Sequence, residues 1–254
     1  MTTVLKVKNL CKTYVINKRQ NNVLRNVNFT MKEGELVSIM GPSGSGKSTL
    51  LYTVSGMDNL TAGNVDFFGK DISSLSKNEI SNVRLREMGF IFQQMYMLKN
   101  LSIYDNIVLP AYQSKNNSKS KKQINEYAKD LMRKMDIIDV ADNDINEVSG
   151  GQLQRACICR SLINSPKMVF ADEPTGSLNK QASAEVMEEI KRVNKEGTSI
   201  LLVTHDVRVA AMSSRVLYID NGNISGEFSL AEYDENNIKE RERVINNWLL
   251  DMGW

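Results

Sequence analysis

The 254-residue sequence predicts an α/β fold in which a mostly parallel sheet is flanked by helices. Short apolar runs such as Leu36–Met40 have the length of buried parallel strands. That run leads through a glycine-rich turn at 41–46 into a helical segment, and another apolar run, 167–171, ends in two carboxylates. With 41% hydrophobic and 24% charged residues, the chain suits one such domain with a helical insert.

Residues 1–34 and 62–70 carry patterns typical of short strands. In the first segment Val27, Phe29 and Met31 alternate with polar residues, which places their side chains on one face of a strand. In the second segment a short apolar run ends in glycine. The sequence therefore predicts strands on both sides of the glycine-rich turn.

A complete phosphate-binding loop follows the first apolar run. Gly41, Gly44 and Gly46 let the backbone curl so that successive amides point at an anion, and the following helix directs the positive end of its dipole to the same place. Lys47 is expected to reach the β- and γ-phosphates, and Ser48 to offer its hydroxyl to Mg²⁺. The predicted nucleotide-binding residues of this loop are Gly41, Ser43, Gly44, Ser45, Gly46, Lys47, Ser48 and Thr49.

Two carboxylates and the chain's one histidine are the catalytic candidates. Asp172 and Glu173 end an apolar run, and open α/β sheets place their ligand sites at the carboxyl ends of strands. Asp172 is predicted to hold Mg²⁺ through water, and Glu173 to act as a general base on the attacking water. His205 follows a further apolar run and has no partners for a histidine metal cluster or a hydrolase triad, so we interpret it as a nucleotide sensor.

The segment 148–155, VSGGQLQR, resembles the signature of the ATP-binding-cassette ATPases. Other motifs match that family in the right order. They are the aromatic Tyr14, Gln93 in the run GFIFQ, the loop 176–179 after the carboxylates, and the switch histidine His205. The resemblance therefore rests on several ordered motifs.

The resemblance covers about residues 4–225, which we assign as the nucleotide-binding domain 1–225. It implies a P-loop NTPase core, an antiparallel β subdomain formed by the early strands, and a helical insert at about 95–164 that carries the signature. Residues 226–254 extend beyond the minimal cassette.

The resemblance also implies residue roles. Tyr14 stacks on adenine, Gln93 takes part in catalysis by sensing Mg²⁺ and the attacking water, and His205 contacts the γ-phosphate. The implied metal-binding residues are Ser48, Gln93 and Asp172.

The signature residues are Ser149, Gly150, Gly151 and Gln152. The resemblance implies that they open a helix running to about Ile163, whose positive end faces a γ-phosphate held by the opposite subunit. The alternative is a helix capped by Ser149 and nothing more, which leaves the paired glycines and Gln152 unexplained.

The expected partners follow from the same resemblance. The chain is expected to form a head-to-tail homodimer that sandwiches two ATP molecules, and to work with a membrane permease encoded separately. No apolar stretch approaches eighteen residues and the amino terminus does not resemble a secretion signal, so a cytoplasmic protein, peripheral on the inner face of the membrane, is expected. A net charge of +2 argues against a nucleic-acid partner.

The segments after Gln93 and Asp172 resemble a subgroup that includes macrolide exporters, lipoprotein-release ATPases and antimicrobial-peptide resistance transporters. The loop 94–98 would receive the permease, although Met97 and Leu98 could equally pack into the helical insert. We favour antimicrobial-peptide export or resistance. The alternatives are lipoprotein release, macrolide efflux, mechanical signalling to cell-wall enzymes, and a soluble repair or translation ATPase.

Two features depart from the general family. Asn179 stands where the family carries aspartate, which puts coupling between the two sites in doubt. The extension has a helical pattern, and charges that include Arg241 are expected to be solvated before an apolar face. The apolar face comprises Ile245, Trp248, Leu249 and Met252. We predict that the chain's own core or the second subunit covers it, with the permease as the less favoured alternative.

Overall fold

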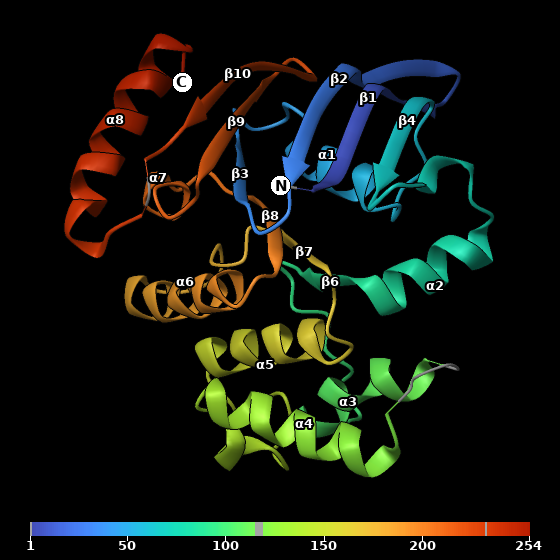
Figure 1. The fold of residues 1–254 in the computed structure, drawn as a ribbon, viewed down its shortest axis with the longest axis vertical. Helices are drawn as coiled ribbons and strands as arrows, with labels where there is room; N and C mark the ends of the chain where they lie inside the picture. The colour runs from blue at the N-terminus through green and yellow to red at the C-terminus, as the bar shows by residue number, and fades with distance from the viewer. Residues whose placement is uncertain (1, 115–118, 232) are drawn as a thin grey trace. The chain divides into compact units, whose positions relative to one another are not determined.

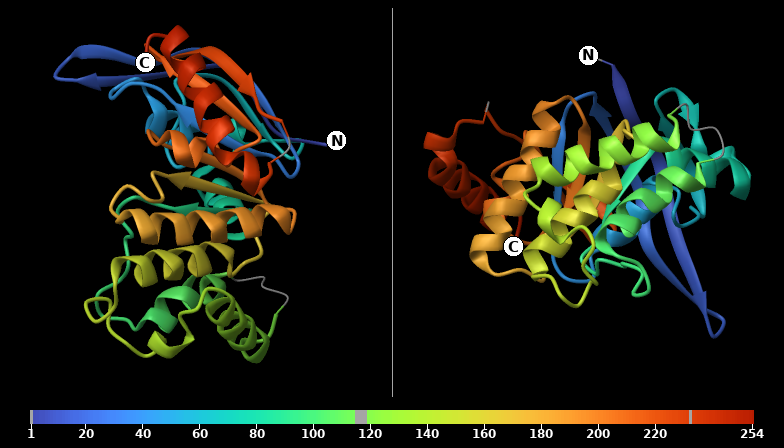
Figure 2. Two further views of the ribbon diagram at one scale, coloured as in Figure 1. Left: turned by 90° about the vertical axis from the view of Figure 1, so that its left-hand side faces the viewer. Right: turned by 90° about the horizontal axis from the view of Figure 1, so that it is seen from below.

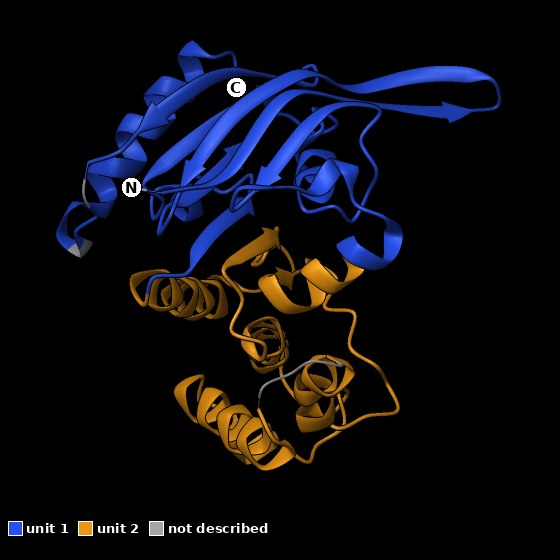
Figure 3. Ribbon diagram, turned by 45° about the vertical axis from the view of Figure 1, so that its right-hand side comes forward, with its two compact units in different colours: residues 1–80, 197–254 blue, residues 81–196 orange. Residues whose placement is uncertain are grey.

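The computed structural model describes residues 2–114, 119–231 and 233–254. Its contacts divide the chain into two compact units, Met1–Ile80 with Gly197–Trp254 as unit 1, and Ser81–Glu196 as unit 2 (Figure 3). Helix α2 (Lys77–Glu87) contains the boundary between residues 80 and 81.

Unit 1 contains an antiparallel sheet with the strand order β2-β1-β4-β5. The bounds are β1 (Thr3–Ile16), β2 (Arg19–Lys32), β4 (Ala62–Phe67) and β5 (Lys70–Asp71). Strands β1 and β2 lie side by side as a long hairpin (Figure 1), and its tip extends away from the rest of unit 1 in both views of Figure 2. The two turn residues Asn17 and Lys18 have φ of 51° and 66°, and such left-handed pairs match the twist of the flanking strands.

The second group of strands in unit 1 is mostly parallel. Strand β3 (Leu36–Met40) pairs in parallel with β8 (Ser199–Val203) and with β9 (Arg215–Asp220), and β10 (Asn223–Ser229) pairs antiparallel with β9. All residues of β3 and β8 are buried, which explains why both strands are apolar except for one small polar residue each, Ser38 and Ser199. Helix α1 (Lys47–Val54) follows β3, and α7 (Val207–Ala210) follows β8.

Unit 2 contains one parallel strand pair and four helices longer than ten residues, within the described part of the chain. The pair is β6 (Met88–Ile91) with β7 (Met168–Asp172). The helices are α3 (Ile103–Gln113), α4 (Lys121–Lys134), α5 (Gly150–Leu162) and α6 (Lys180–Lys195). The parallel pairs in both units and the antiparallel sheet confirm the predicted fold class.

The extension ends in helix α8 (Ile238–Asp251), which belongs to unit 1 and packs on the strands of that unit. Ile245 and Leu249 are fully buried in a cluster with Met40 and Tyr218, and Trp248 stacks on Phe228 with ring centroids 5.3 Å apart. The chain's own core therefore covers this apolar face, which is one of the two alternatives that we predicted.

The expectation that Arg241 is solvated was wrong, because this side chain is only 4% exposed. Its guanidinium donates hydrogen bonds to the carbonyl oxygens of Ala211 at 2.6 Å, Ala231 at 2.5 Å and Ser213 at 2.5 Å. Three carbonyl acceptors replace the hydration that the charge would otherwise need. The acceptors lie 10 to 30 residues away, so the local charge pattern carried no sign of them.

Candidate nucleotide site

The phosphate loop in unit 1 can be built only from glycine at two of its positions. A Cβ on Gly41 would lie 2.0 Å from the carbonyl oxygen of Ile219. Gly46 has φ of 105° and precedes α1 as its N-cap. The Lys47 ammonium donates to the carbonyl oxygens of Gly41 at 2.8 Å and Pro42 at 2.9 Å. The loop is therefore curled around the start of the helix, as the sequence predicted.

The remaining loop residues differ in exposure. Ser43 and Gly44 are exposed, Ser45 is buried, and Ser48 and Thr49 are half-buried in the first turn of α1. Within the described residues no side chain caps this end of α1, and the positive end of the helix dipole faces the loop. This end of the helix fits the phosphates of ATP with the accompanying Mg²⁺.

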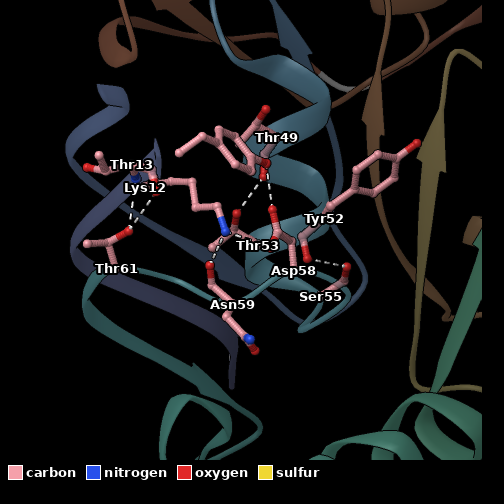
Figure 4. A network of polar contacts seen from close by, with 10 residues as sticks. Lys12, Thr13, Thr49, Tyr52, Thr53, Ser55, Asp58, Asn59 and Thr61 are labelled. Atoms are coloured by element: carbon pink, nitrogen blue, oxygen red, sulfur yellow. Dashed lines mark hydrogen bonds and ion pairs between the residues drawn. The ribbon is translucent and has the colours of Figure 1, made fainter. Parts of the chain in front are cut away.

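Tyr14, the predicted adenine-stacking residue, lies near the end of β1 within a polar network. Its hydroxyl donates to Asp58 at 2.5 Å, and Lys12 donates to the same carboxylate at 2.6 Å. Figure 4 shows Lys12 reaching between Asp58 and Asn59, just beyond the last turn of α1. The sequence analysis missed Lys12 and Asp58, because 46 residues separate them and neither belongs to a recognisable motif.

Burial and the contacts of this network shift the pKa of Tyr14 and of Asp58. Burial raises the pKa of Tyr14, and the neighbouring Asp58 raises it further. Burial also acts to raise the pKa of Asp58, but hydrogen bonds from Lys12 and Tyr14 outweigh it and hold this pKa below its ordinary value. The network therefore consists of an ammonium, a carboxylate and a neutral phenol.

His205 is exposed at the carboxyl end of β8, after the buried Thr204. The next residue, Asp206, forms an ion pair with Arg208 at 2.7 Å and caps α7 by accepting from the Arg208 amide at 2.8 Å. Burial acts to raise the pKa of Asp206, but these contacts with Arg208 lower it overall. Asp206 thus stabilises the turn after β8 that contains His205.

The catalytic candidates of unit 2 gather after β6 and β7. Asp172 is the last residue of β7 and is 7% exposed, and Glu173 follows it half-buried. Glu173 has φ of 46°, an unusual backbone conformation for a residue other than glycine, and such conformations cluster at functional sites. Gln93 lies against Gly176, since a Cβ on that glycine would come within 3.0 Å of the Gln93 amide nitrogen.

The signature residues form a capping box at the start of α5. The Ser149 hydroxyl accepts from the Gln152 amide at 3.2 Å, and the Gln152 side chain accepts from the Ser149 amide at 2.9 Å. Gly151 is buried, and a Cβ there would lie 3.3 Å from the Ala182 Cβ on α6. The view that simple capping leaves Gln152 unexplained was therefore wrong, because Gln152 takes part in the capping box and helix packing favours a small residue at Gly151.

Asn179 has a local structural role in unit 2. It is the N-cap of α6, and its side chain accepts a hydrogen bond from the Ala182 amide at 2.9 Å. Aspartate and asparagine are about equally good N-caps. The departure from the family pattern therefore removes a charge and keeps the cap.

The segment after Gln93 is held by two polar side chains of unit 2. Arg160 donates to the carbonyl oxygens of Met95 at 2.7 Å and Tyr96 at 2.8 Å. The buried Asn106 accepts from the Leu98 amide at 2.7 Å. Tyr96 is 63% exposed and Leu98 is 51% exposed, so Leu98 does not pack into the helical insert.

Unit 1 therefore holds Tyr14, the loop 41–49 and His205, while unit 2 holds the other predicted site residues. The unit 2 residues are Gln93, Ser149, Gly150, Gly151, Gln152, Asp172 and Glu173.

A family model described as ABC transporter matches residues 24–176. The chain belongs to the ABC transporter family. It is 40% identical over 233 residues to the uncharacterized ABC transporter ATP-binding protein YknY of Bacillus subtilis, covering 90% of this chain and 100% of the relative. It is 41% identical over 222 residues to the lipoprotein-releasing system ATP-binding protein LolD of Wigglesworthia glossinidia brevipalpis, covering 87% and 96%.

A solved structure supports the same conclusion. The dimeric post-hydrolysis state of the ATP-binding cassette MJ0796 of Methanocaldococcus jannaschii, bound to ADP and Pi, matches with a TM-score of 0.83 and 34% sequence identity. The match covers 90% of this chain and 100% of that one. This ABC protein is therefore an ATP-binding and ATP-hydrolysing subunit that uses ATP with Mg²⁺. In the described residues no helix has the length and apolar character needed to cross a bilayer.

Proposed function

We propose that the chain is the ATPase subunit of an antimicrobial-peptide export or resistance transporter, works as a homodimer, and powers a permease encoded separately. The observation that carries the ATPase role is the curled loop around the uncapped start of α1, with Lys47 folded against it. The dimer is supported by the dimeric state of the similar cassette. We assign 1–225 to ATP binding and 226–254 to an extension of the same subunit.

Nucleotide binding is assigned to the residues of unit 1. Tyr14 offers its ring to adenine, and Lys47 donates to the β- and γ-phosphates once its bonds to Gly41 and Pro42 are exchanged for them. Ser48 contributes a hydroxyl to Mg²⁺. The other loop residues, Gly41, Ser43, Gly44, Ser45, Gly46 and Thr49, supply backbone donors and the required curvature.

Hydrolysis is assigned to Glu173 as general base. A water oxygen forms a bond to the γ-phosphorus, the bond from that phosphorus to the bridging oxygen breaks, and Glu173 takes the proton of the water. Asp172 and Gln93 orient Mg²⁺ and the water, and His205 contacts the γ-phosphate. The products are ADP and inorganic phosphate.

The second subunit completes each site in this proposal. Ser149, Gly150, Gly151 and Gln152 of one protomer face the γ-phosphate bound by the other. The capping box orients the positive end of α5 and leaves the amides of the two glycines for the anion.

The permease is proposed to bind the segment held by Arg160 and Asn106. The exposed Tyr96 and Leu98 offer an apolar surface on a backbone that several hydrogen bonds hold in place. Binding there would locate the chain in the cytoplasm, peripheral on the inner face of the membrane. Lipoprotein release is the second candidate function, because a relative with that activity in its name is 41% identical.

The experiment that tests the catalytic assignment is Glu173→Gln. We expect ATP to bind with unchanged affinity and hydrolysis to slow by about two decades or more, since general bases contribute roughly 10²- to 10⁴-fold. Dimers should accumulate with ATP and Mg²⁺ in size-exclusion chromatography. The exposed Glu188 on α6 supplies a matched control, Glu188→Gln, which should hydrolyse ATP normally. Normal turnover by Glu173→Gln would refute the assignment.

The transported substrate needs a cellular test. Deletion of the coding sequence should sensitise the native cell to peptide antibiotics that act on the cell surface, and the wild-type chain should restore resistance. Unchanged peptide sensitivity together with lipoproteins retained in the membrane would favour the second candidate.

A further inference from the structure

We propose that Lys12 and Asp58 are positioning residues that hold the Tyr14 ring where the adenine base binds. The inference rests on the proposed role of Tyr14 in base stacking. It adds two residues that no sequence motif identifies, and it assigns them to affinity for the base.

Lys12 is the centre of this network. Its side chain is buried to 7% exposure, and its ammonium donates to Asp58 at 2.6 Å and to the carbonyl oxygen of Asn59 at 2.5 Å. The same nitrogen lies 4.6 Å from the centroid of the Tyr14 ring. Lys12 therefore covers one face of the ring, and a base stacks on the opposite face.

Asp58 fixes the edge of the ring. Its carboxylate accepts the Tyr14 hydroxyl at 2.5 Å, and its amide donates to the carbonyl oxygen of Tyr52 in α1 at 3.0 Å. Helix α1 begins at Lys47, so the segment that carries the phosphate loop also anchors Tyr14. Within unit 1 the contacts thus connect the predicted base site to the phosphate site.

Tyr14 needs such an anchor because it lies close to the hairpin tip. The next two residues, Val15 and Ile16, are 66% and 64% exposed. A ring held at its face by Lys12 and at its edge by Asp58 has little conformational freedom left to lose when a base stacks on it. A cation behind the ring also draws on its electron density, which favours contact with another π-system on the front face.

The charges of the pair depend on each other. Removing either partner leaves the other partly buried without its counter-ion, which is unfavourable. Loss of Lys12 therefore displaces Asp58, and with it the acceptor of the Tyr14 hydroxyl. The expected consequence is weaker base binding with unchanged phosphate binding.

The test compares binding of ATP with binding of inorganic triphosphate, which has no base, to the full-length protein with Mg²⁺. We expect Lys12→Met to weaken ATP binding roughly tenfold, within the range of base stacking on an aromatic ring, and to leave triphosphate affinity unchanged. Lys12→Arg keeps the charge and should recover part of the ATP affinity. Lys8→Met, an exposed lysine on the same strand, is the matched control and should bind both ligands normally.

A second pair of variants covers the case in which Lys12→Met does not fold. Asp58→Asn keeps the size of the side chain and an acceptor while removing its charge, and Tyr14→Phe removes the hydroxyl and keeps the ring. Each should weaken ATP binding severalfold and spare triphosphate. The double variant should bind ATP no more weakly than Tyr14→Phe, because both changes break the contact between Tyr14 and Asp58 and only Tyr14→Phe also removes the hydrogen bond with Thr49.

The outcomes separate this inference from the function on which it rests. If Tyr14→Ala leaves ATP affinity unchanged, the stacking role of Tyr14 fails. If Tyr14→Ala weakens ATP binding while Lys12→Met and Asp58→Asn do not, only the positioning role fails. Equal losses for ATP and triphosphate in those variants would mean general destabilisation and would also overturn it.

Discussion

Two glycine-rich segments precede helices in this protein, and the N-termini of these two helices are capped differently. The loop before α1 ends in Gly46, whose φ of 105° lies in the left-handed region, and no described side chain caps that helix. The segment before α5 has Ser149 in extended backbone and a reciprocal capping box with Gln152. The first helix begins without a side-chain cap among the described residues, whereas the Ser149 hydroxyl accepts from a leading amide of the second.

The difference shows that the two segments contain glycine for different structural reasons. In the first loop glycine is required by backbone conformation and by the close approach of the Ile219 carbonyl to Gly41. In the second, the approach of Ala182 across the contact between α5 and α6 favours a small residue at Gly151. Backbone conformation determines the glycines of the first segment, and helix packing limits the size of the residue at position 151 in the second.

The largest expected effect is a loss of ATP affinity when the positive charge of Lys47, in the first segment, is removed. Lys47→Ala should reduce ATP affinity at least about 100-fold, because charge-assisted hydrogen bonds contribute about 1.5 to 3 kcal/mol each and Lys47 is expected to make two. Titration with a fluorescent nucleotide measures this loss. Lys70→Ala, an exposed lysine of unit 1, is the control. Retained affinity in Lys47→Ala would remove the loop from the nucleotide site.

The next largest expected effect is on stability, and it compares Gly46 with Gly151. Gly46→Ala should destabilise the protein by about 1 to 3 kcal/mol, since alanine is strained at that φ, and lower the Tm by about 2 to 4 °C for each kcal/mol. Gly151→Ala should change stability by less than about 1 kcal/mol, because alanine favours the helix and offsets the 3.3 Å contact with Ala182. Thermal unfolding of both variants tests this. A larger loss for Gly151→Ala would reverse the comparison.

A smaller effect is expected from the cap itself. Ser149→Ala should lower the free energy of unfolding by about 1 kcal/mol through loss of the capping box, and should also impair ATPase activity while sparing ATP binding to the monomer. Gln152→Glu retains a residue suited to the box and should be nearly as stable as the wild type. Denaturant unfolding and turnover assays measure both quantities. Unchanged stability in Ser149→Ala would show that the capping box contributes nothing to the free energy of unfolding.

The smallest effect on stability is expected at the third helix start, α6. Asn179→Asp should change the free energy of unfolding by less than about 0.5 kcal/mol, since both residues cap helices equally well. The added charge should instead alter the Hill coefficient of ATP hydrolysis, because the loop crosses the proposed dimer interface. Identical Hill coefficients would make the substitution silent for coupling between the sites.

The sequence by itself determined the elements whose signal is local. Short, mostly apolar runs identified β3 and β7, the glycine spacing identified the phosphate loop, and a spacing of three and four residues identified the apolar face of α8. Each of these patterns depends on residues within one strand, loop or helix. The spacing of apolar residues and of glycines within one segment therefore suffices to recognise them.

Contacts between distant segments were decided only by the tertiary structure. The Lys12–Asp58–Tyr14 network joins β1 to the end of α1, and Arg241 is buried because backbone carbonyls from the preceding segments converge on it. A lysine or an arginine looks the same in sequence whether water or protein oxygens surround it. Whether the charge is buried depends on which acceptors folding brings within about 3 Å.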